Sequence, residues 1–419
     1  MNIEWKILMN NFKIPKIRFM NFNDKWKYKI LGEISNSIEY GLNASAKDFD
    51  GIHKYLRITD IDDSSRLFLT DKLSSPDVNF TEEDYENYKL QINDLLFART
   101  GASVGKTYLY RESDGEVYYA GFLIRARLHD SYDGNFIFQQ TLTDKYKQFI
   151  EITSQRSGQP GVNGKEYGDW KIGMTSYPEQ SAIGSLFRTL DDLLASYKEN
   201  LANYQSLKAT MLSKMFPKAG QAVPEIRLDG FEGEWKVKEF GDVVEFYSGL
   251  TYKPSDVVSS GTLVLRSSNV RDGELIYKDN VFVNPDIVNC QHVKFGDIVV
   301  VVRNGSRDLI GKHALIKSEM PNTVIGAFMT GVKSDRPEFV NALLDTKVFV
   351  SEINKNLGST INQITTGNFK RMKFSFPTKE EQQAIGTYFS NLDNLITAHQ
   401  EKISKLETLK KKLLQDMFI

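Results

Sequence analysis

The sequence predicts an α+β protein made of two tandem copies of one mixed domain, each copy followed by a long helix. Three observations predict this fold: a repeat that runs through the chain, short β-rich segments within each copy, and a heptad pattern at the end of each copy. Trp26 recurs 209 positions later as Trp235, and residues 182–184 recur 202 positions later as residues 384–386. A slowly shrinking offset is expected for two diverged copies of one folding unit whose loops differ in length. Such a duplication imitates a two-fold dimer within one chain.

The first part of each copy, 15–178 and 224–377, mixes short apolar runs with turn residues. Runs of β-branched and aromatic residues bounded by glycine-containing turns are typical of strands. Helical stretches lie between them, so we expect a mixed α+β domain of roughly 155 residues in each copy. The expected strands are 55–58, 94–98, 262–265 and 297–302, and 338–355 is an expected helical stretch.

The second part of each copy is a long helix with a strict heptad pattern. Apolar residues alternate at steps of four and three, which indicates a packing face along the helix. Each seam carries a lysine at the same step, and neither helix has an internal proline. The seam residues are Ile183, Phe187, Leu190, Leu194, Tyr197, Leu201, Tyr204, Lys208, Met211 and Met215 in the first copy, and Ile385, Phe389, Leu392, Ile396, His399, Ile403, Leu406, Lys410, Leu413 and Met417 in the second.

Connectivity predicts how these two helices pair. Only a short linker separates the first helix from the second domain, so the second helix must run back antiparallel to pack against the first. Each helix has about 36 residues, or roughly 50 Å, and we expect an antiparallel coiled coil that acts as a ruler between two domains of pseudo-two-fold arrangement. The expected boundaries are an N-terminal segment 1–14, a first mixed domain 15–178, a spacer helix 179–216, a linker 217–223, a second mixed domain 224–377 and a second spacer helix 378–419.

The composition is that of a soluble globular protein with no strong charge. The chain has 419 residues, with 53 basic and 54 acidic side chains and a net charge of −1. Many DNA-binding proteins carry a basic excess, so any DNA contact here is expected to use local patches or to occur beside partners that supply charge. Cys290 is the single cysteine, and the sequence has neither a secretory signal pattern nor a membrane span. We therefore expect a cytoplasmic protein without a membrane partner.

Signatures of catalysis are missing from the sequence. The five histidines are scattered, and no cluster has the spacing of a metal site. Residues 100–107 come close to a phosphate-binding loop, but Thr100 replaces its leading glycine. The matching segment of the second copy ends in Gly311-Lys312-His313, without the hydroxyl that binds magnesium. We therefore expect no nucleotide, metal or catalytic site in this chain.

The same segment is the best sign of DNA contact. Residues 99–111 hold three basic side chains and no acid, and the matching residues 303–317 hold four basic side chains against Asp308. Arginine and lysine on glycine-rich loops can approach phosphates, and arginine can bridge the two acceptors of guanine. A solvated basic loop is the plainer alternative. The recurrence of the loop in both copies, with different residues between fixed ends, favours DNA contact.

A second pair of loops, 156–163 and 358–363, comes late in each domain. Their Gly, Ser, Asn and Gln residues suit turns, but Asn and Gln also make bidentate contacts to adenine. Arg57 and Arg266 lie in strands of both copies, and we interpret them as members of a scaffold ion pair. The candidate DNA-contacting residues are Arg99, Ser103, Lys106, Arg156, Gln159, Asn163, Arg303, Asn304, Arg307, Lys312, Asn362 and Gln363.

Taken together, the motifs resemble a known family. The matching segments are 224–235 with its echo at 15–26, 266–270, Gly296-Asp297, 358–360, 377–386 and the two terminal helices. In this order and in duplicate, they resemble the specificity subunit of type I restriction–modification systems, over essentially the whole chain beyond residue 14.

The resemblance implies a non-catalytic, DNA-binding subunit. It implies two target-recognition domains, each reading one half of a bipartite, asymmetric site in double-stranded DNA. It also implies helices that set the spacing between the half-sites and dock two methyltransferase subunits, which two restriction–translocation subunits then join. S-adenosylmethionine, ATP and Mg²⁺ would be bound by these partners. The alternatives are a coiled-coil structural adaptor without base readout and a stand-alone DNA-modifying enzyme.

Overall fold

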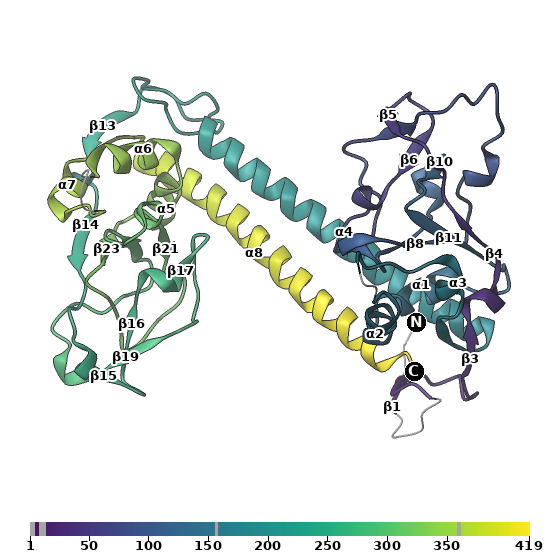
Figure 1. The fold of residues 1–419 in the computed structure, drawn as a ribbon. Helices are drawn as coiled ribbons and strands as arrows, with labels where there is room; N and C mark the ends of the chain where they lie inside the picture. Colours follow the sequence, from purple (N-terminus) through teal and green to yellow (C-terminus); the bar gives the residue numbers. More distant parts are fainter. Residues whose placement is uncertain (1–4, 8–13, 156–157, 358–361) are drawn as a thin grey trace. The chain divides into compact units, whose positions relative to one another are not determined.

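The computed structural model describes residues 5–7, 14–155, 158–357 and 362–419. The chain divides into two compact units (Figure 1). Unit 1 comprises Met1–Glu199 and Glu401–Ile419, and unit 2 comprises Asn200–Gln400. Each long helix contributes to both units, because α4 spans Tyr177–Lys214 and α8 spans Lys379–Asp416.

Unit 1 is built around a four-stranded antiparallel sheet of order β4-β11-β8-β9. A short parallel pair, β10-β6, and an antiparallel pair, β12-β3, accompany it. The strands are β1 (Trp5–Ile7), β2 (Ile17–Phe19), β3 (Lys27–Ile30), β4 (Ser35–Tyr40), β5 (Ala46–Asp48), β6 (Lys54–Leu56), β7 (Ser74–Pro76), β8 (Asp94–Ala98), β9 (Thr107–Leu109), β10 (Val117–Tyr119), β11 (Leu123–Leu128) and β12 (Lys171–Met174), and the helices are α1 (Gly134–Gln140), α2 (Asp144–Thr153) and α3 (Gly164–Gly168).

Unit 2 repeats this topology. Its four-stranded antiparallel sheet has the order β14-β23-β20-β21, and its parallel contact β16-β22 and antiparallel pair β13-β24 match those of unit 1. The strands are β13 (Lys236–Glu239), β14 (Glu245–Ser248), β15 (Val257–Val258), β16 (Thr262–Leu265), β17 (Val270–Arg271), β18 (Glu274–Leu275), β19 (Val281–Val283), β20 (Ile298–Val301), β21 (His313–Leu315), β22 (Thr323–Ile325), β23 (Met329–Lys333) and β24 (Lys373–Phe376), and the helices are α5 (Pro337–Leu344), α6 (Lys347–Asn356) and α7 (Thr366–Arg371).

The mixed α+β fold in two copies is therefore confirmed, and the expected strands match β6, β8, β16 and β20 closely. The expected helical stretch 338–355 is two helices, α5 and α6, rather than one. The break falls at Thr346, whose side chain accepts a hydrogen bond from the backbone N–H of Phe349 and so caps the start of α6. A threonine cap satisfies the unpaired donors of a new helix, which favours a break at this point.

The two long helices pack against each other in antiparallel fashion within each unit. In unit 1, Asp191 of α4 contacts Lys410 of α8 at 2.5 Å. In unit 2, Lys208 of α4 lies 2.7 Å from Asp393 of α8. The two seam lysines that recur in the sequence are therefore each paired with an aspartate of the opposite helix. An unpaired ammonium at a helix–helix seam would be unfavourable, and these aspartates remove that penalty.

The end of each long helix completes the core of a domain that it does not follow directly in sequence. Phe418, after α8, lies in the core of unit 1 against Trp26, Phe136 and Phe187. Phe216, after α4, lies in the core of unit 2 against Trp235. The compact units thus cut across both helices, whereas the boundaries expected from the sequence set the helices apart as spacers. The reason is that the Met-Phe end of each helix is apolar and becomes buried.

Candidate nucleic-acid interface

The same backbone arrangement follows the central strand of each sheet. After β8 the chain leaves through Arg99 and returns to β9, and the N–H of Gly105 donates to the carbonyl of Ala98 at 3.0 Å. After β20, the N–H of Gly311 donates to the carbonyl of Val301 at 2.8 Å. Both glycines have positive φ angles of 82° and 88°, which favour glycine because it lacks a Cβ atom. The fixed ends of the two basic loops therefore reflect one shared turn geometry.

Two further segments meet each basic loop. In unit 1 the N–H of Arg99 donates to the carbonyl of Phe122, and the N–H of Val162 donates to the carbonyl of Arg99. In unit 2 the backbone of Val302 makes the same two bonds, to Phe328 and from Ile364. We call residues 99–106, 120–123 and 158–163 loop cluster 1, and residues 302–312, 326–329 and 362–364 loop cluster 2. Each cluster thus joins a basic loop, a phenylalanine turn and the late loop.

Each cluster carries an arginine that lies over an aromatic ring. The guanidinium carbon of Arg99 is 5.0 Å from the centre of the Tyr40 ring and 6.0 Å from that of Phe122. That of Arg303 is 4.9 Å from the centre of the Phe328 ring. Among the described residues, neither guanidinium forms an ion pair with a carboxylate. Both cations therefore keep their charge available to an anionic ligand.

The two arginines occupy successive rather than equivalent backbone positions. Arg99 shares the backbone bonds of Val302, whereas Arg303 is one residue further on and forms a bridge with Gln363. Both side chains nevertheless reach the ring of the phenylalanine turn. The two clusters have the same scaffold but present different side chains at its surface.

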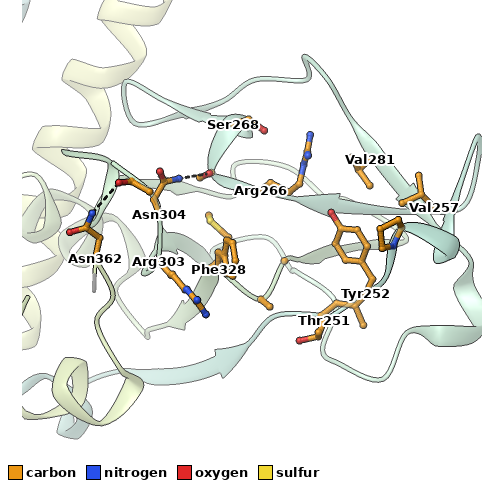
Figure 2. A pocket seen from close by; sticks show the side chains of 17 residues that line it. Thr251, Tyr252, Val257, Arg266, Ser268, Val281, Arg303, Asn304, Phe328 and Asn362 are labelled. Carbon is orange, nitrogen blue, oxygen red and sulfur yellow. Dashed lines mark hydrogen bonds between the residues drawn. The ribbon is translucent and has the colours of Figure 1, made fainter. Parts of the chain in front are cut away.

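In unit 2 the arginine faces a hollow of about 1150 Å³ (Figure 2). Arg303, Asn304 and Asn362 line it together with Arg266, Phe328 and Tyr252. The side-chain amide of Asn304 donates to Ser267 Oγ at 2.9 Å, and that of Asn362 donates to the carbonyl of Gly305 at 3.0 Å. Both asparagines therefore hold the loops in place, and base reading by their amides stays a prediction.

Two other candidates of unit 2 lie elsewhere. Arg307 and Lys312 are exposed and line a second hollow of about 530 Å³, which also includes Asp308 and His313. The guanidinium of Arg307 lies 3.5 Å from the carbonyl of Asn354. The structure thus separates the basic residues of this loop into two groups and does not bring them all to one site.

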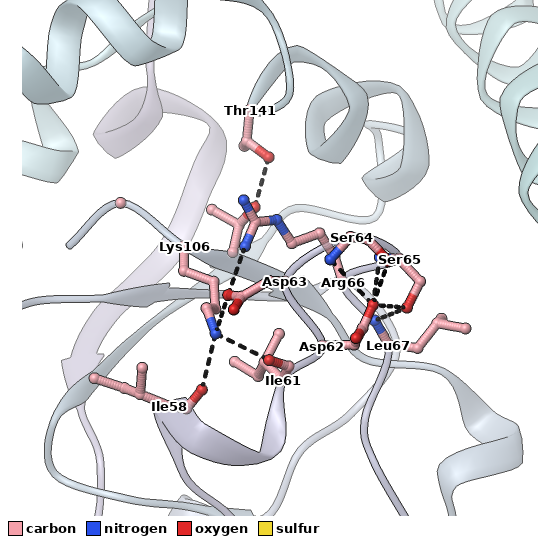
Figure 3. A network of polar contacts seen from close by, with 12 residues as sticks. Ile58, Ile61, Asp62, Asp63, Ser64, Ser65, Arg66, Leu67, Lys106 and Thr141 are labelled. Carbon is pink, nitrogen blue, oxygen red and sulfur yellow. Dashed lines mark hydrogen bonds and ion pairs between the residues drawn. The ribbon is translucent and has the colours of Figure 1, made fainter. Parts of the chain in front are cut away.

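Lys106 is buried and its charge is already used within the fold (Figure 3). Its ammonium donates to the carbonyl of Ile61 at 3.0 Å and lies 2.6 Å from Asp63 Oδ1. Its hydrogen bond to Asp63 lowers the pKa of that carboxyl below its usual value. Contact with a phosphate would require breaking these bonds, so they favour a structural role for Lys106, and its assignment as a DNA contact stays a prediction. The same bonds argue against phosphate binding by residues 100–107, the segment that comes close to a phosphate-binding loop.

The remaining candidates of unit 1 differ in their availability. Gln159 is exposed beside Gly101, and Ser103 is half-buried in the short turn Gly101–Ser103. Asn163 is exposed, but its side-chain oxygen accepts from the N–H of Glu166 at 2.9 Å and caps α3. Arg156 lies outside the described residues.

Within the described ranges, no group of three or more His, Cys, Asp or Glu side chains is arranged to hold a metal ion. Across that same part of the chain, no helix has the length and apolar character needed to cross a membrane.

Comparison with known proteins finds a family model and several proteins that are similar to this chain. Residues 232–408 match the family described as type I restriction modification DNA specificity domain. This segment lies in the second copy and covers less than half of the 419 residues. Two proteins of Methanocaldococcus jannaschii are similar to this chain: the type I restriction enzyme MjaVIII specificity subunit and the putative type I restriction enzyme MjaX specificity subunit. Each is 23% identical over 96% of this chain, and the matched region covers 94% of the first protein and 95% of the second. The crystal structure of the S subunit from M. genitalium has the same fold, with a TM-score of 0.65, 16% identity and coverage of 97% of this chain and 99% of that one.

The structure also tests the scaffold ion pair expected for Arg57 and Arg266. Arg57 binds Asp60 through two hydrogen bonds of 2.8 and 2.9 Å, and Asp60 raises the pKa of Arg57, so the interpretation is confirmed in unit 1. In unit 2, Asn269 stands at the position of Asp60. Among the described residues, the Nη2 of Arg266 donates to the carbonyl of Asp279, and its buried Nε has no partner. The ion-pair interpretation is therefore wrong for Arg266, because its partner is neutral.

Sequence reasoning missed three features of the site. The first is Arg266, which lines the larger hollow. The sequence could have indicated it, because the acidic Asp60 of the first copy is replaced by the neutral Asn269 at the matching position of the second copy. The other two are Phe122 and Phe328, which recur 206 positions apart and are both exposed. Their apolar character and strand-rich surroundings made them resemble core residues.

Proposed function

We propose that this chain is the specificity subunit of a type I restriction–modification system. It would read double-stranded DNA through loop clusters 1 and 2, each contacting one half of a bipartite, asymmetric site. The observation that carries the proposal is the recurrence of one scaffold with different surface residues. Arg99 and Arg303 each project from that scaffold without a carboxylate partner among the described residues. Guanidinium groups of this kind suit the phosphate backbone and the paired acceptors of guanine. Unlike side chains on like scaffolds favour unlike half-sites.

The charge of the chain supports binding that depends on local patches and on partners. A net charge of −1 gives little non-specific attraction to DNA. The two arginines and the exposed Arg307 and Lys312 supply local positive charge in a molecule whose net charge is only −1. We infer that tight binding requires the assembled complex, in which partner subunits add contacts to the DNA.

The long helices are proposed to set the spacing between the half-sites and to dock the partners. Four leucines on them are exposed, Leu193 and Leu409 in unit 1 and Leu207 and Leu395 in unit 2. Each leucine directly precedes a seam residue, and in antiparallel helices such positions border the same edge of the seam. Each unit thus offers one exposed leucine pair. Two equivalent apolar patches fit two copies of one partner, the methyltransferase subunit.

Catalysis is proposed to reside in the partners. Two methyltransferase subunits would bind S-adenosylmethionine, and two restriction–translocation subunits would bind ATP and Mg²⁺. The bonds that hold Lys106 to Asp63 and to the carbonyls of Ile58 and Ile61 support this, because they leave no free lysine for a nucleotide phosphate at the near-miss loop.

The experiment is to co-express the chain with its methyltransferase subunits and to map methylated adenines in the host genome. Arg303→Ala should relax or abolish recognition in one half of the motif, and Arg99→Ala should act on the other half, each at a cost of about 1–3 kcal/mol if the arginine bridges guanine. Arg271→Ala, an exposed arginine outside both clusters, serves as the control. An unchanged motif and unchanged methylation for both arginine variants would contradict the proposal.

A further inference from the structure

Two exposed phenylalanines occupy matching turns of the two units. Phe122 is 62% exposed just before β11, and Phe328 is 51% exposed just before β23. The carbonyl of each accepts a hydrogen bond from the start of the basic loop, at 3.1 Å in unit 1 and 3.0 Å in unit 2. Each turn is therefore tied to the loop that carries the arginine. An apolar ring kept at the surface in both copies gains little for the core of either unit.

Each ring instead supports a cation. A guanidinium over an aromatic face is attracted by the ring and packs flat against it. The guanidinium carbon of Arg303 lies over the ring of Phe328, and that of Arg99 lies over the rings of Phe122 and Tyr40. Stacking restricts the rotamers of a long side chain before any ligand arrives, which lowers the entropy lost on binding. It also leaves the N–H edge of the guanidinium free for a pair of acceptor oxygens or nitrogens.

We propose that Phe122 and Phe328 are positioning residues that hold Arg99 and Arg303 in place for contact with duplex DNA. This inference rests on the proposed function of the two loop clusters. The shared ligand chemistry is a pair of hydrogen-bond acceptors, which either two phosphate oxygens or the O6 and N7 of guanine provide. The exposed remainder of each ring then packs against the DNA when the arginine binds.

The two units should differ in how strongly they depend on the phenylalanine. Arg99 has a second supporting ring in Tyr40, whose hydroxyl accepts from the N–H of Gly164 at 3.1 Å and so holds that ring in place. Within the described residues, Phe328 is the one ring recorded under Arg303. Loss of Phe328 should therefore weaken DNA contact more than loss of Phe122.

The test uses the complex with the methyltransferase subunits and a labelled duplex that carries the methylated motif mapped in the host. Phe328→Ala should weaken binding about fivefold, whereas Phe328→Tyr, which keeps the aromatic face, should restore it. Phe295→Ala is the matched control, because Phe295 is 62% exposed in the turn before β20 and has no arginine over its ring among the described contacts. Thermal stability should be the same for all three variants, since the rings are exposed.

A double variant shows whether the ring acts through the arginine. If it does, Arg303→Ala with Phe328→Ala should bind no more weakly than Arg303→Ala alone. A phosphate contact predicts equal weakening on the mapped and the scrambled duplex with a smaller salt slope, and a guanine contact predicts a loss confined to one base pair. Either pattern supports the inference.

Three results would overturn the inference: Phe328→Ala binding as well as Phe295→Ala, no rescue by Phe328→Tyr, or fully additive losses in the double variant. If Arg303→Ala itself left binding unchanged, the failure would lie with the proposed function of loop cluster 2. Weakening by Arg303→Ala without any effect of Phe328→Ala would leave that function standing and reject only the role of the ring.

Discussion

The last residues of the chain should stabilise the first domain rather than the second. Phe418 is 8% exposed, and its ring centre lies 5.6 Å from that of Phe136 and 5.7 Å from that of Phe187. Truncation of a buried phenylalanine to alanine costs about 3–5 kcal/mol. Because Phe418 keeps 8% of its surface exposed, we expect the lower end of this range, about 3 kcal/mol, for Phe418→Ala. For a domain of this size, that lowers the Tm of unit 1 by about 6–12 °C.

Hydrogen exchange measured by mass spectrometry locates the effect. In Phe418→Ala, the amides of β8 and β11 should exchange faster, while those of β20 and β23 should keep their protection. Phe216→Ala should give the reverse pattern, because Phe216 is buried in unit 2 against Trp235 and Phe389. Leu409→Ala, an exposed change on α8, is the control. Equal loss of protection in both units, or none in either, would refute the assignment of Phe418 to the core of unit 1.

Three further predictions concern the helices and the ion pairs near them. Burial raises the pKa of Asp345, but His313, 3.3 Å away, and Lys208 outweigh burial and lower that pKa to about 2. The contribution of Asp345 to stability, about 2 kcal/mol, is therefore present above pH 4 and lost as the pH falls toward 2. The difference in unfolding free energy between wild type and Asp345→Asn should shrink over that range, and a constant difference would contradict this. Leu193→Glu with Leu409→Glu should leave one methyltransferase subunit bound instead of two by native mass spectrometry, and retention of both would reject the leucine pair as a docking site. Seven residues added to each long helix, after Glu199 and after Gln400, lengthen both helices by about 10 Å and keep the heptad pattern. The mapped gap between the half-sites should then lengthen by about three base pairs. An unchanged gap with full methylation would show that the helices do not set the spacing.

The sequence was sufficient to predict the elements whose burial follows a period. Heptad steps located both long helices, and their connectivity predicted the antiparallel pairing. The sequence also shows that a lysine interrupts each apolar seam at the same step, but only the structure shows why. Lys410 pairs with Asp191 and Lys208 pairs with Asp393. In each pair the aspartate lies on the other long helix, so no local sequence pattern connects it to the lysine.

The candidate site was less predictable because exposure depends on distant parts of the chain. Lys106 lies in a basic, glycine-rich loop that resembles a surface segment. Its ammonium is nevertheless buried and donates a hydrogen bond to the carbonyl of Ile61, 45 residues earlier in the chain. Phe122 and Phe328 lie in apolar runs that resemble core, yet both rings are exposed. Arg266 shows the opposite case. The neutral Asn269 in the sequence indicates that Arg266 lacks an acidic partner, but the sequence does not indicate that Arg266 lines the larger hollow.

Exchange of one recognition domain tests the central claim, that each unit reads its own half of the DNA site. Residues 224–377 are replaced by the corresponding segment of a specificity subunit with a different motif, with Trp235 and Phe339 kept because they contact Phe216. The chimera is expressed with the methyltransferase subunits, and methylated adenines are mapped across the host genome. We expect one half of the methylated motif to change to that of the donor while the other half stays the same. A change in both halves, or an unaltered motif at full methylation, would contradict the account.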